Sequence, residues 1–139
     1  MIDRVLVPID GSEMADRALE YALTVHDDAE ITVLFVAGEP SPFMGRALSV
    51  ALDDDVGEAA EEMAEEVFAD AHRIAREHDV EIDTAVTVGN PGRQIVEYAE
   101  DFDAVVIGSH GGTLQSRLFV GNVADRVFRR SPVPVTVVR

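Results

Sequence analysis

A glycine-bearing segment near the end of the chain has the residue types that can bind an anion through the main chain. It is the run GSHGGTLQSRLFVGN from Gly108 to Asn122, which follows the apolar stretch DAVVI. Glycines at 108, 111 and 121 permit backbone geometries that a Cβ atom would block, so main-chain N–H groups can converge on one ligand. Because a helix-like stretch begins at Gly121, the segment also precedes a helix N-terminus, where phosphate groups bind readily. The pattern predicts a phosphate cradle that needs no lysine.

The charge of the chain is uneven, and this glycine segment lies in its least acidic part. Eleven arginines and no lysine stand against 27 acidic residues, for a net charge of −16. Thirteen acids and two arginines fall within residues 53–83, whereas five arginines and one acid, Asp125, fall within residues 108–139. A locally positive region suits an anion site, but the same arginines could instead pair with acids elsewhere in the fold.

Composition excludes several classes of protein. A chain of 139 residues predicts a single domain over residues 1–139. The strong acidity argues against binding to nucleic acid or to an anionic membrane, and no apolar run approaches the about 20 residues that a membrane span needs. Cysteine is absent, which excludes disulfides and zinc–thiolate sites. No leader-like segment opens the chain, so we expect a cytoplasmic protein. Its acidity suits a high-salt, halophilic cytoplasm, and we expect the fold to loosen as salt is withdrawn.

Apolar stretches of strand length alternate along the chain with stretches of helical period. We predict strands over residues 2–9, 31–37, 82–88, 104–107 and 133–138. We predict helices from an N-cap at Ser12 to about 25, over 56–78, from an N-cap at Asn90 to about 101, and over 122–130. The intervening residues 38–55 contain two prolines and two glycines and predict a long loop that could cover a ligand.

This alternation is typical of an α/β fold, in which right-handed crossovers build a parallel sheet between two layers of helices. We therefore predict a single-domain, three-layer α/β/α sandwich. In such sheets ligands bind beyond the carboxyl ends of the strands, where the strand order reverses. The predicted loops at those ends are residues 10–12, 89–91 and 108–111.

No set of residues in the chain fits catalysis. Ser109 and His110 are adjacent, so their side chains point apart, and no third group is spaced to orient the imidazole. His72 and His78 would not share a helix face, which makes them a poor metal pair. The Walker A and GxGxxG patterns are missing, and a phospho-acceptor role for Asp10 would need a lysine that the chain lacks. We predict binding rather than turnover, with no catalytic and no metal-ligating side chains.

Several motifs together resemble the universal stress protein family over essentially the whole chain. They are VLVPIDGSEMA, VGNP, VVIGSHGG, PVPVTVV and the spacing Gly108-x2-Gly111-x9-Gly121. The resemblance implies a five-stranded parallel sheet of order 3-2-1-4-5, of the nucleotide-alpha-hydrolase-like type. It also implies a homodimer formed by antiparallel pairing of the edge strand Val133–Val138, and a sheet edge of this kind does invite another chain. In one branch of the family ATP is held after the fourth strand, which implies ATP as the ligand, accompanied by Mg²⁺.

Carried over position by position, the resemblance also implies a set of nucleotide-binding residues. Asp10 would meet the ribose or the metal end of the nucleotide, Val36 would offer backbone groups to adenine, and Pro8 would help to line that pocket. The phosphates and ribose would be surrounded by Gly108, Gly111, Gly112, Gly121, Asn122 and Val123. Asn122 departs from the ATP-binding branch, which usually has Ser or Thr there. Its amide can donate to a phosphate oxygen, or it could simply cap the last helix.

The resemblance and the glycine pattern together predict a nucleotide-binding stress or energy sensor that signals to an unknown protein partner. Two alternatives stay open at this stage. A family member without a nucleotide would work through protein contacts alone, with the glycine segment retained for packing. A slow ATPase would use the same nucleotide site for turnover.

Overall fold

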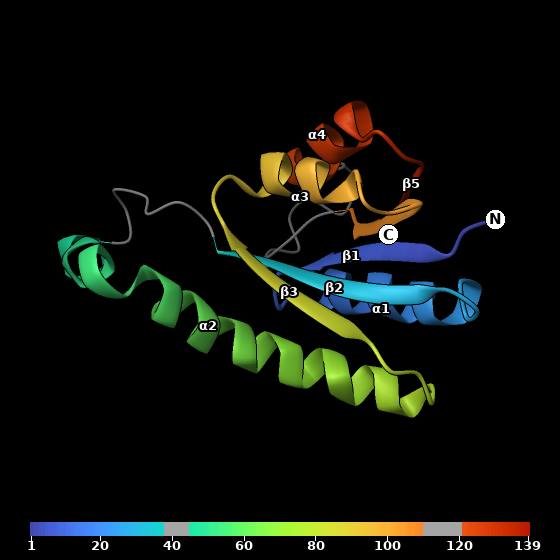
Figure 1. Cartoon of the computed structure of the whole chain (residues 1–139), viewed down its shortest axis with the longest axis horizontal. Coiled ribbons are helices and arrows are strands. Elements are labelled where there is room, and N and C mark those ends of the chain that lie inside the picture. Colours follow the sequence, from blue (N-terminus) through green and yellow to red (C-terminus); the bar gives the residue numbers. More distant parts are fainter. Residues whose placement is uncertain (38–44, 110–120) are drawn as a thin grey trace.

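The computed structural model is an α/β fold with one sheet between two layers of helices (Figure 1). It describes residues 1–37, 45–109 and 121–139, and of residues 45–60 the backbone. The strands in these residues are β1 Arg4–Ile9, β2 Glu30–Ala37, β3 Asp83–Val88, β4 Ala104–Gly108 and β5 Val135–Val138. The helices are α1 Glu13–Val25, α2 Gly45–Glu77, α3 Pro91–Ala99 and α4 Asn122–Arg130.

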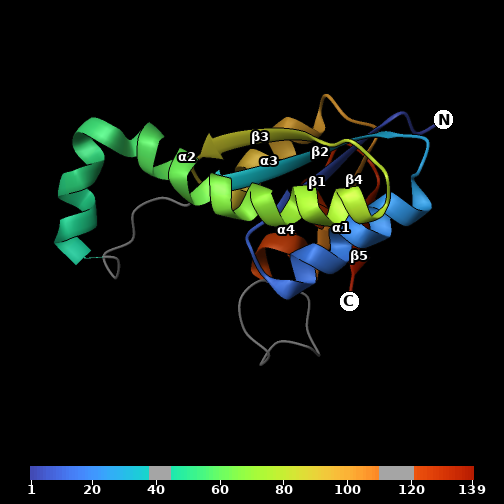
Figure 2. The same cartoon turned by 90° about the horizontal axis from the view of Figure 1, so that it is seen from below.

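The sheet has the order β3-β2-β1-β4-β5, and its neighbouring strands are all parallel, as predicted. Helices α1 and α2 cover one face, and α3 and α4 cover the other (Figure 2). The chain thus builds outward from β1 in one direction through β2 and β3, and then in the other through β4 and β5. The strand order therefore reverses between β1 and β4.

Two apolar clusters, one on each face, hold the three layers together. In β1 the side chains of Val5 and Val7 enter the cluster under α1 and α2, while Leu6 enters the cluster under α3 and α4. This is the two-residue alternation of a strand that is buried on both faces. Helix α1 buries one apolar stripe, formed by Ala15, Ala18, Leu19, Ala22 and Leu23.

The two helix starts that the sequence marked with capping residues are confirmed. The Ser12 hydroxyl accepts a hydrogen bond at 3.2 Å from the N–H of Ala15, the third residue of α1. The Asn90 side-chain oxygen accepts from the Arg93 N–H at 3.1 Å, and Pro91 occupies the first position of α3. Both residues satisfy N–H groups that the start of a helix leaves without an intrahelical partner.

The predicted loop over residues 38–55 is wrong for its second part. Helix α2 begins at Gly45 rather than near Val56, and residues 38–44 lie outside the described part of the chain. The prediction gave too much weight to prolines and glycines, since both prolines precede the helix and residues 46–52 (RALSVAL) are mostly good helix formers. Strand boundaries differ from the predictions by at most two residues, the usual uncertainty at element ends.

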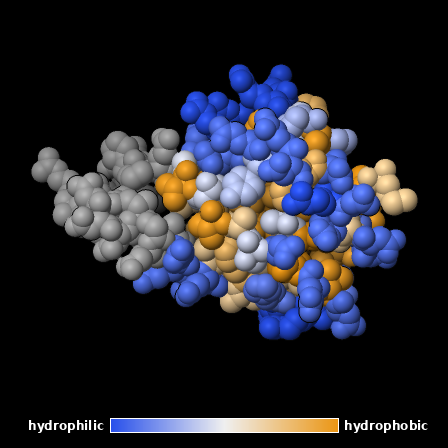
Figure 3. Space-filling view, viewed as in Figure 1, coloured by the Kyte–Doolittle hydropathy of each residue, from blue (hydrophilic) through white to orange (hydrophobic). Residues whose placement is uncertain are grey.

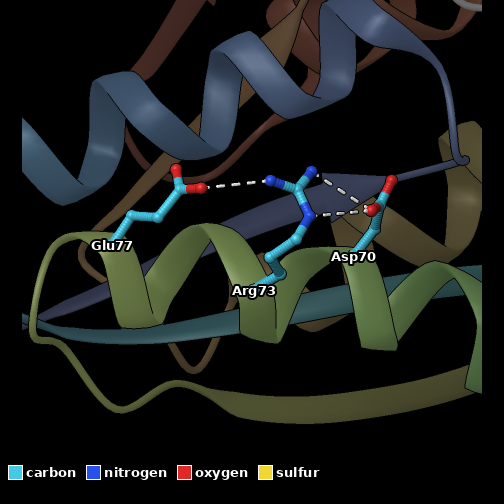
Figure 4. A network of polar contacts seen from close by, with 3 residues as sticks. All are labelled: Asp70, Arg73 and Glu77. Atoms are coloured by element: carbon cyan, nitrogen blue, oxygen red, sulfur yellow. Dashed lines mark hydrogen bonds and ion pairs between the residues drawn. The ribbon is translucent and has the colours of Figure 1, made fainter.

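The outer surface carries the acidic residues, some of them tied locally by arginines. Hydrophilic residues cover much of the face in Figure 3, with hydrophobic ones among them. On α2, Arg73 forms ion pairs of 3.2 Å with Asp70 and with Glu77 (Figure 4). All three side chains are about half exposed, so solvent screens both ion pairs and each contributes little to stability. In the described part of the chain, no helix has the length and apolarity that a membrane crossing requires.

At the amino edge of the sheet, Asp103 fastens the start of β1 to the segment that leads into β4. One carboxylate oxygen of Asp103 accepts hydrogen bonds from the Asp3 N–H at 2.9 Å and the Arg4 N–H at 3.0 Å. The Arg4 guanidinium donates to the Asp101 carbonyl at 2.7 Å and lies 4.7 Å from the centre of the Phe102 ring. The two backbone hydrogen bonds are the main reason that the pKa of Asp103 lies below its ordinary value of 3.8.

We predict that Asp103→Asn lowers the free energy of unfolding at pH 7 and that this deficit shrinks in acid. Because the pKa of Asp103 is depressed in the fold, its carboxylate stabilises the protein above the ordinary value of 3.8 and ceases to do so as the pH falls through the folded value. Denaturant unfolding in salt at pH 7 and near pH 3 measures both stabilities. Asp101→Asn is the matched control, since it keeps the carbonyl that Arg4 uses. An Asp103→Asn deficit of equal size at both pH values would contradict the assignment.

Candidate functional site

The predicted ligand loops meet at one edge of the sheet. Asp10 directly follows β1, Gly89 and Asn90 follow β3, and Ser109 follows β4. Since the strands are all parallel, these segments lie at the shared carboxyl edge, as the sequence predicted. The predicted site residues Gly111 and Gly112 lie outside the described residues.

The strands on the two sides of the order reversal are paired over only part of their length. β1 and β4 are in register at Val5 with Ala104 and at Leu6 with Val105, near their amino ends. By contrast, β1 and β2 are in register along the whole of Arg4–Ile9. The carboxyl halves of β1 and β4 therefore lie outside their shared ladder. In open α/β sheets this reversal point is where ligands bind.

The start of α4 is fastened to this point by the main chain. The Gly121 N–H donates to the Ser109 carbonyl, and the Ser109 N–H donates to the Val138 carbonyl at 2.8 Å. Ser109 is almost fully buried, at 3% exposed. These bonds place the first turn of α4 directly beyond the carboxyl end of β4.

Gly121 is the N-cap of α4, and it makes no side-chain capping bond. A glycine cap leaves the first N–H groups of the helix without the acceptor that Ser, Thr, Asp or Asn would supply. These N–H groups carry the positive end of the helix dipole. Gly121 is half-buried, and Val123, two residues further along, is 39% exposed. The main-chain N–H groups at this helix start are therefore suited to an anion.

The alternative in which Asn122 caps the last helix is wrong. Asn122 is the first residue inside α4, and the capping position belongs to Gly121. A residue inside the first turn no longer has the extended backbone that lets a cap side chain reach back to the N–H groups. Asn122 is exposed at this edge.

Asp10 has a local structural role at the turn between β1 and α1. Its side-chain oxygen Oδ1 accepts from the Ser12 N–H at 2.9 Å, and Gly11 between them has a φ of +83°. A side chain at position 11 would be strained at that φ, so the turn requires glycine. The Asp10 carboxyl group is exposed at the carboxyl edge, with its second oxygen Oδ2 outside this turn.

The helices on the α1 and α2 face make that side of the edge acidic. The pKa of Asp16 in α1 is raised, chiefly by partial burial and then by the charge of Asp70 in α2, while Arg73 opposes the shift. Glu20 and Asp10 raise it further. A pKa raised by like charges marks negative potential. An anionic ligand is therefore favoured toward the opposite face of the sheet.

On that opposite face, Arg126 of α4 contacts the start of α3 at the same edge. The Arg126 guanidinium donates to the Asn90 side-chain oxygen at 3.2 Å, which joins α4 to the start of α3. One turn further along, Arg129 forms an ion pair of 3.1 Å with Asp125. Arg129 thus pairs with an acid of its own helix and Arg126 contacts a neutral amide, and the anion site stays a prediction. The Asn90–Arg126 contact escaped the sequence analysis because its partners lie on different helices, 36 residues apart.

The two residues assigned to the adenine side lie in the central strands. Pro8 is buried in β1 beside Leu34 of β2. Val36 is half-buried in β2 and is paired with Thr87 of β3. Both are in the carboxyl halves of their strands, so they lie toward the edge that holds Asp10 and Gly108.

Gly108 has a packing reason to be glycine. A Cβ atom there would lie 2.9 Å from both the carbonyl oxygen and the Cγ atom of Met14 in α1. The backbones of β4 and α1 can approach this closely only without a side chain at position 108. This contact seats α1 against the reversal point, independently of any ligand.

This sheet order, with its glycine-capped helix at the reversal point, defines an open α/β protein, and comparisons with known proteins identify its family. The model of the universal stress protein family matches residues 1–139. The chain is 31% identical to Universal stress protein MJ0531 of Methanocaldococcus jannaschii, over 98% of this chain and 81% of that one. The chain belongs to the universal stress protein family.

Solved structures of relatives share the fold. Universal stress protein UspA from Lactobacillus plantarum is 26% identical, with a TM-score of 0.72 over 99% of this chain and 98% of that one. A universal stress protein crystallised in complex with cAMP is 25% identical, with a TM-score of 0.71 over 99% of this chain and 97% of that one.

We predict that Gly108→Ala lowers the free energy of unfolding by about 1–3 kcal/mol, the usual cost of overpacking a core. The added Cβ would contact the Met14 backbone as well as its side chain. Adding Met14→Ala should therefore recover little of the loss, because the carbonyl oxygen stays in place. Denaturant unfolding of the single and double variants measures this. A double variant as stable as Met14→Ala alone would show that the backbone contact is unimportant.

Proposed function

We propose that this protein binds an adenine nucleotide, ATP accompanied by Mg²⁺, and acts as a cytoplasmic stress or energy sensor by binding rather than by turnover. The observation that carries the proposal is the first turn of α4. It has a glycine cap without a side-chain bond, and it is fastened by Ser109 to the point where the strand order reverses. Main-chain N–H groups at such a position are suited to phosphate oxygens.

The likeness to a relative that binds a nucleotide supports the same site. The universal stress protein in complex with cAMP shares the fold of this chain along nearly its whole length. Its ligand combines adenine with a phosphate group, the two parts that the proposed site accommodates. Here Pro8 and Val36 would lie against the adenine, and Gly108, Gly111, Gly112, Gly121, Asn122 and Val123 against the phosphates and ribose.

The residues present fit a metal–nucleotide complex. The exposed Asp10 carboxyl group, one oxygen of which is held by the Ser12 N–H, would face the ribose or the metal. Mg²⁺ would be held mainly by phosphate oxygens and would neutralise part of their charge. The exposed Asn122 amide would donate to a phosphate oxygen, as a Ser or Thr hydroxyl would.

A second candidate function is a stress protein that binds no nucleotide and works through protein contacts. The packing of Gly108 against Met14 favours it, because that contact explains one glycine of the segment without a ligand. It does not explain Gly121, which lies in an ordinary region of φ and ψ, at −67° and 162°. A helix start there would be stabilised by Ser, Thr, Asp or Asn in its place.

The proposal includes a homodimer. β5 is an edge strand of the sheet, and its four residues are half-buried in the single chain. The edge of β5 that faces away from β4 offers unpaired backbone groups, and antiparallel pairing of Val133–Val138 with a second copy would satisfy them. The net charge of −16 per chain opposes this association, because two copies repel each other, and salt screens that repulsion.

We predict that the protein carries or binds adenine nucleotide and that Val123→Glu weakens this binding at least about tenfold. A carboxylate at the second position of α4 interacts favourably with the positive end of the helix dipole, so the variant should remain as stable as the parent protein. The same negative charge should repel the phosphate groups of the nucleotide. Nucleotide released from purified protein by denaturation identifies the ligand, and titration calorimetry with ATP and Mg²⁺ measures the affinity.

Val123→Gln is the matched control for this variant, because it has nearly the size of Glu without the charge. It should bind ATP within about threefold of the parent protein. Absence of binding heat with ATP or ADP, for folded parent protein at high salt, would refute the proposed function. Equal loss in both variants would show that size, not charge, matters at position 123.

For the dimer, we predict that sedimentation at high salt gives twice the mass of one chain and that lowering the salt shifts the protein toward monomer. Interstrand backbone bonds favour association, while the repulsion between two acidic chains grows as screening falls. Circular dichroism on the same samples reports whether the fold persists. A monomer at every protein concentration in high salt would refute the β5 dimer.

A further inference from the structure

Arg126 is set apart from the other described arginines of α4 by its surroundings. It is half-buried between α3 and α4, whereas Arg129 and Arg130 are exposed. Its stem lies against Gly92 of α3, where a Cβ atom would be 2.6 Å from the Arg126 Cδ atom. The buried Gly92 thus provides the space in which Arg126 lies. The stem of Arg126 is thus packed against α3, while its guanidinium makes an exposed hydrogen bond.

The hydrogen-bond partner of Arg126 is a neutral amide. The Asn90 side-chain oxygen accepts from the Arg93 N–H at 3.1 Å and from the Arg126 guanidinium at 3.2 Å. Among the described residues, Arg17, Arg73 and Arg129 form ion pairs with carboxylates, and Arg126 forms none, a property that it shares with Arg4, Arg76, Arg93, Arg130 and Arg139. In a chain with 27 acidic residues, the positive charge of Arg126 is therefore not neutralised by an ion pair in this part of the structure.

The position of this charge is the same edge that carries the proposed nucleotide site. Arg126 is the fifth residue of α4, and Asn90, which its guanidinium contacts, is the second residue beyond the carboxyl end of β3. Figure 1 shows α3 and α4 side by side over one face, and their first turns both begin at this edge. The opposite face presents Asp16 in α1 and Asp70 in α2, whose negative charges repel an anion.

We propose that Arg126 attracts the phosphate chain of the nucleotide, and that the neutral Asn90 holds Arg126 in place without cancelling its charge. The proposal deepens the function proposed above and rests on it. It makes Arg126 a specificity-determining residue for the number of phosphates, because its attraction grows with the negative charge of the ligand. ATP should gain most from it, AMP less and adenosine almost nothing.

A purely structural clamp between α3 and α4 is the competing role for Arg126. Asn90→Asp separates the two roles. Asp has the same shape, is an equally good N-cap, and accepts the same two hydrogen bonds. It should leave the protein at least as stable, since it adds an ion pair and a favourable charge at a helix start. It also neutralises Arg126, so only the role toward an anionic ligand would be lost.

The experiment is titration calorimetry with ATP, AMP and adenosine, each with Mg²⁺, at the lowest salt that keeps the protein folded. For Asn90→Asp we expect about tenfold weaker binding of ATP, a smaller loss for AMP and less than twofold change for adenosine. Arg126→Gln should show the same order of losses. Arg130→Gln removes an equal charge from the far end of α4 and should change each affinity by less than about twofold. Thermal unfolding of every variant accompanies the titrations.

Two results would overturn the inference. If Asn90→Asp binds ATP as tightly as the parent, or loses ATP and adenosine equally, then the charge of Arg126 does not select phosphates. If the parent protein binds none of the three ligands, the proposed function fails and this inference with it. That outcome is distinguishable, because the parent titration alone shows it.

Discussion

The reversal of strand order between β1 and β4 is the constraint on which the rest of the structure depends. Parallel strands need a crossover each, and right-handed crossovers place α1 and α2 on one face and α3 and α4 on the other. β1 must then be buried on both faces, which its alternating Val5, Leu6 and Val7 achieve. β1 is followed by α1 on one face and β4 leads to α4 on the other, so the strand order reverses between their carboxyl ends. That reversal point is where the candidate site lies.

Charge is distributed about the same reversal. The face covered by α1 and α2 carries Asp16 and Asp70, and the pKa of Asp16 is raised first by its partial burial and then by the charge of Asp70. The face covered by α3 and α4 presents Arg126 beside a neutral amide, and a helix start without a side-chain cap. An acidic protein can attract a polyphosphate only where its own negative potential is locally interrupted. The layered fold provides that interruption, because it separates the acidic α2 from α4 by the thickness of the sheet.

Much of the fold could be predicted from the sequence because its signals are local. Helix caps at Ser12 and Asn90 act on N–H groups three residues away, and buried strands are marked by consecutive apolar residues. The start of α2 was missed because proline and glycine signals preceding a helix resemble those of a loop. Asn122 was weighed as a cap because a capping residue and a first helical residue differ only in backbone angles. A residue name does not encode those angles.

By itself, the sequence determined the α/β class, the alternation of elements, the acidic surface and the glycine segment, since each follows from neighbouring residues and from composition. The sheet order and the site residues came from the family resemblance rather than from periodicity. Only the tertiary structure decided that Gly108 packs on Met14 and that Asn90 holds Arg126. Those contacts join residues far apart in the chain, and they exist because packed layers bring β4 to α1 and α3 to α4. Local patterns cannot specify such distances, which are set by the sheet as a whole.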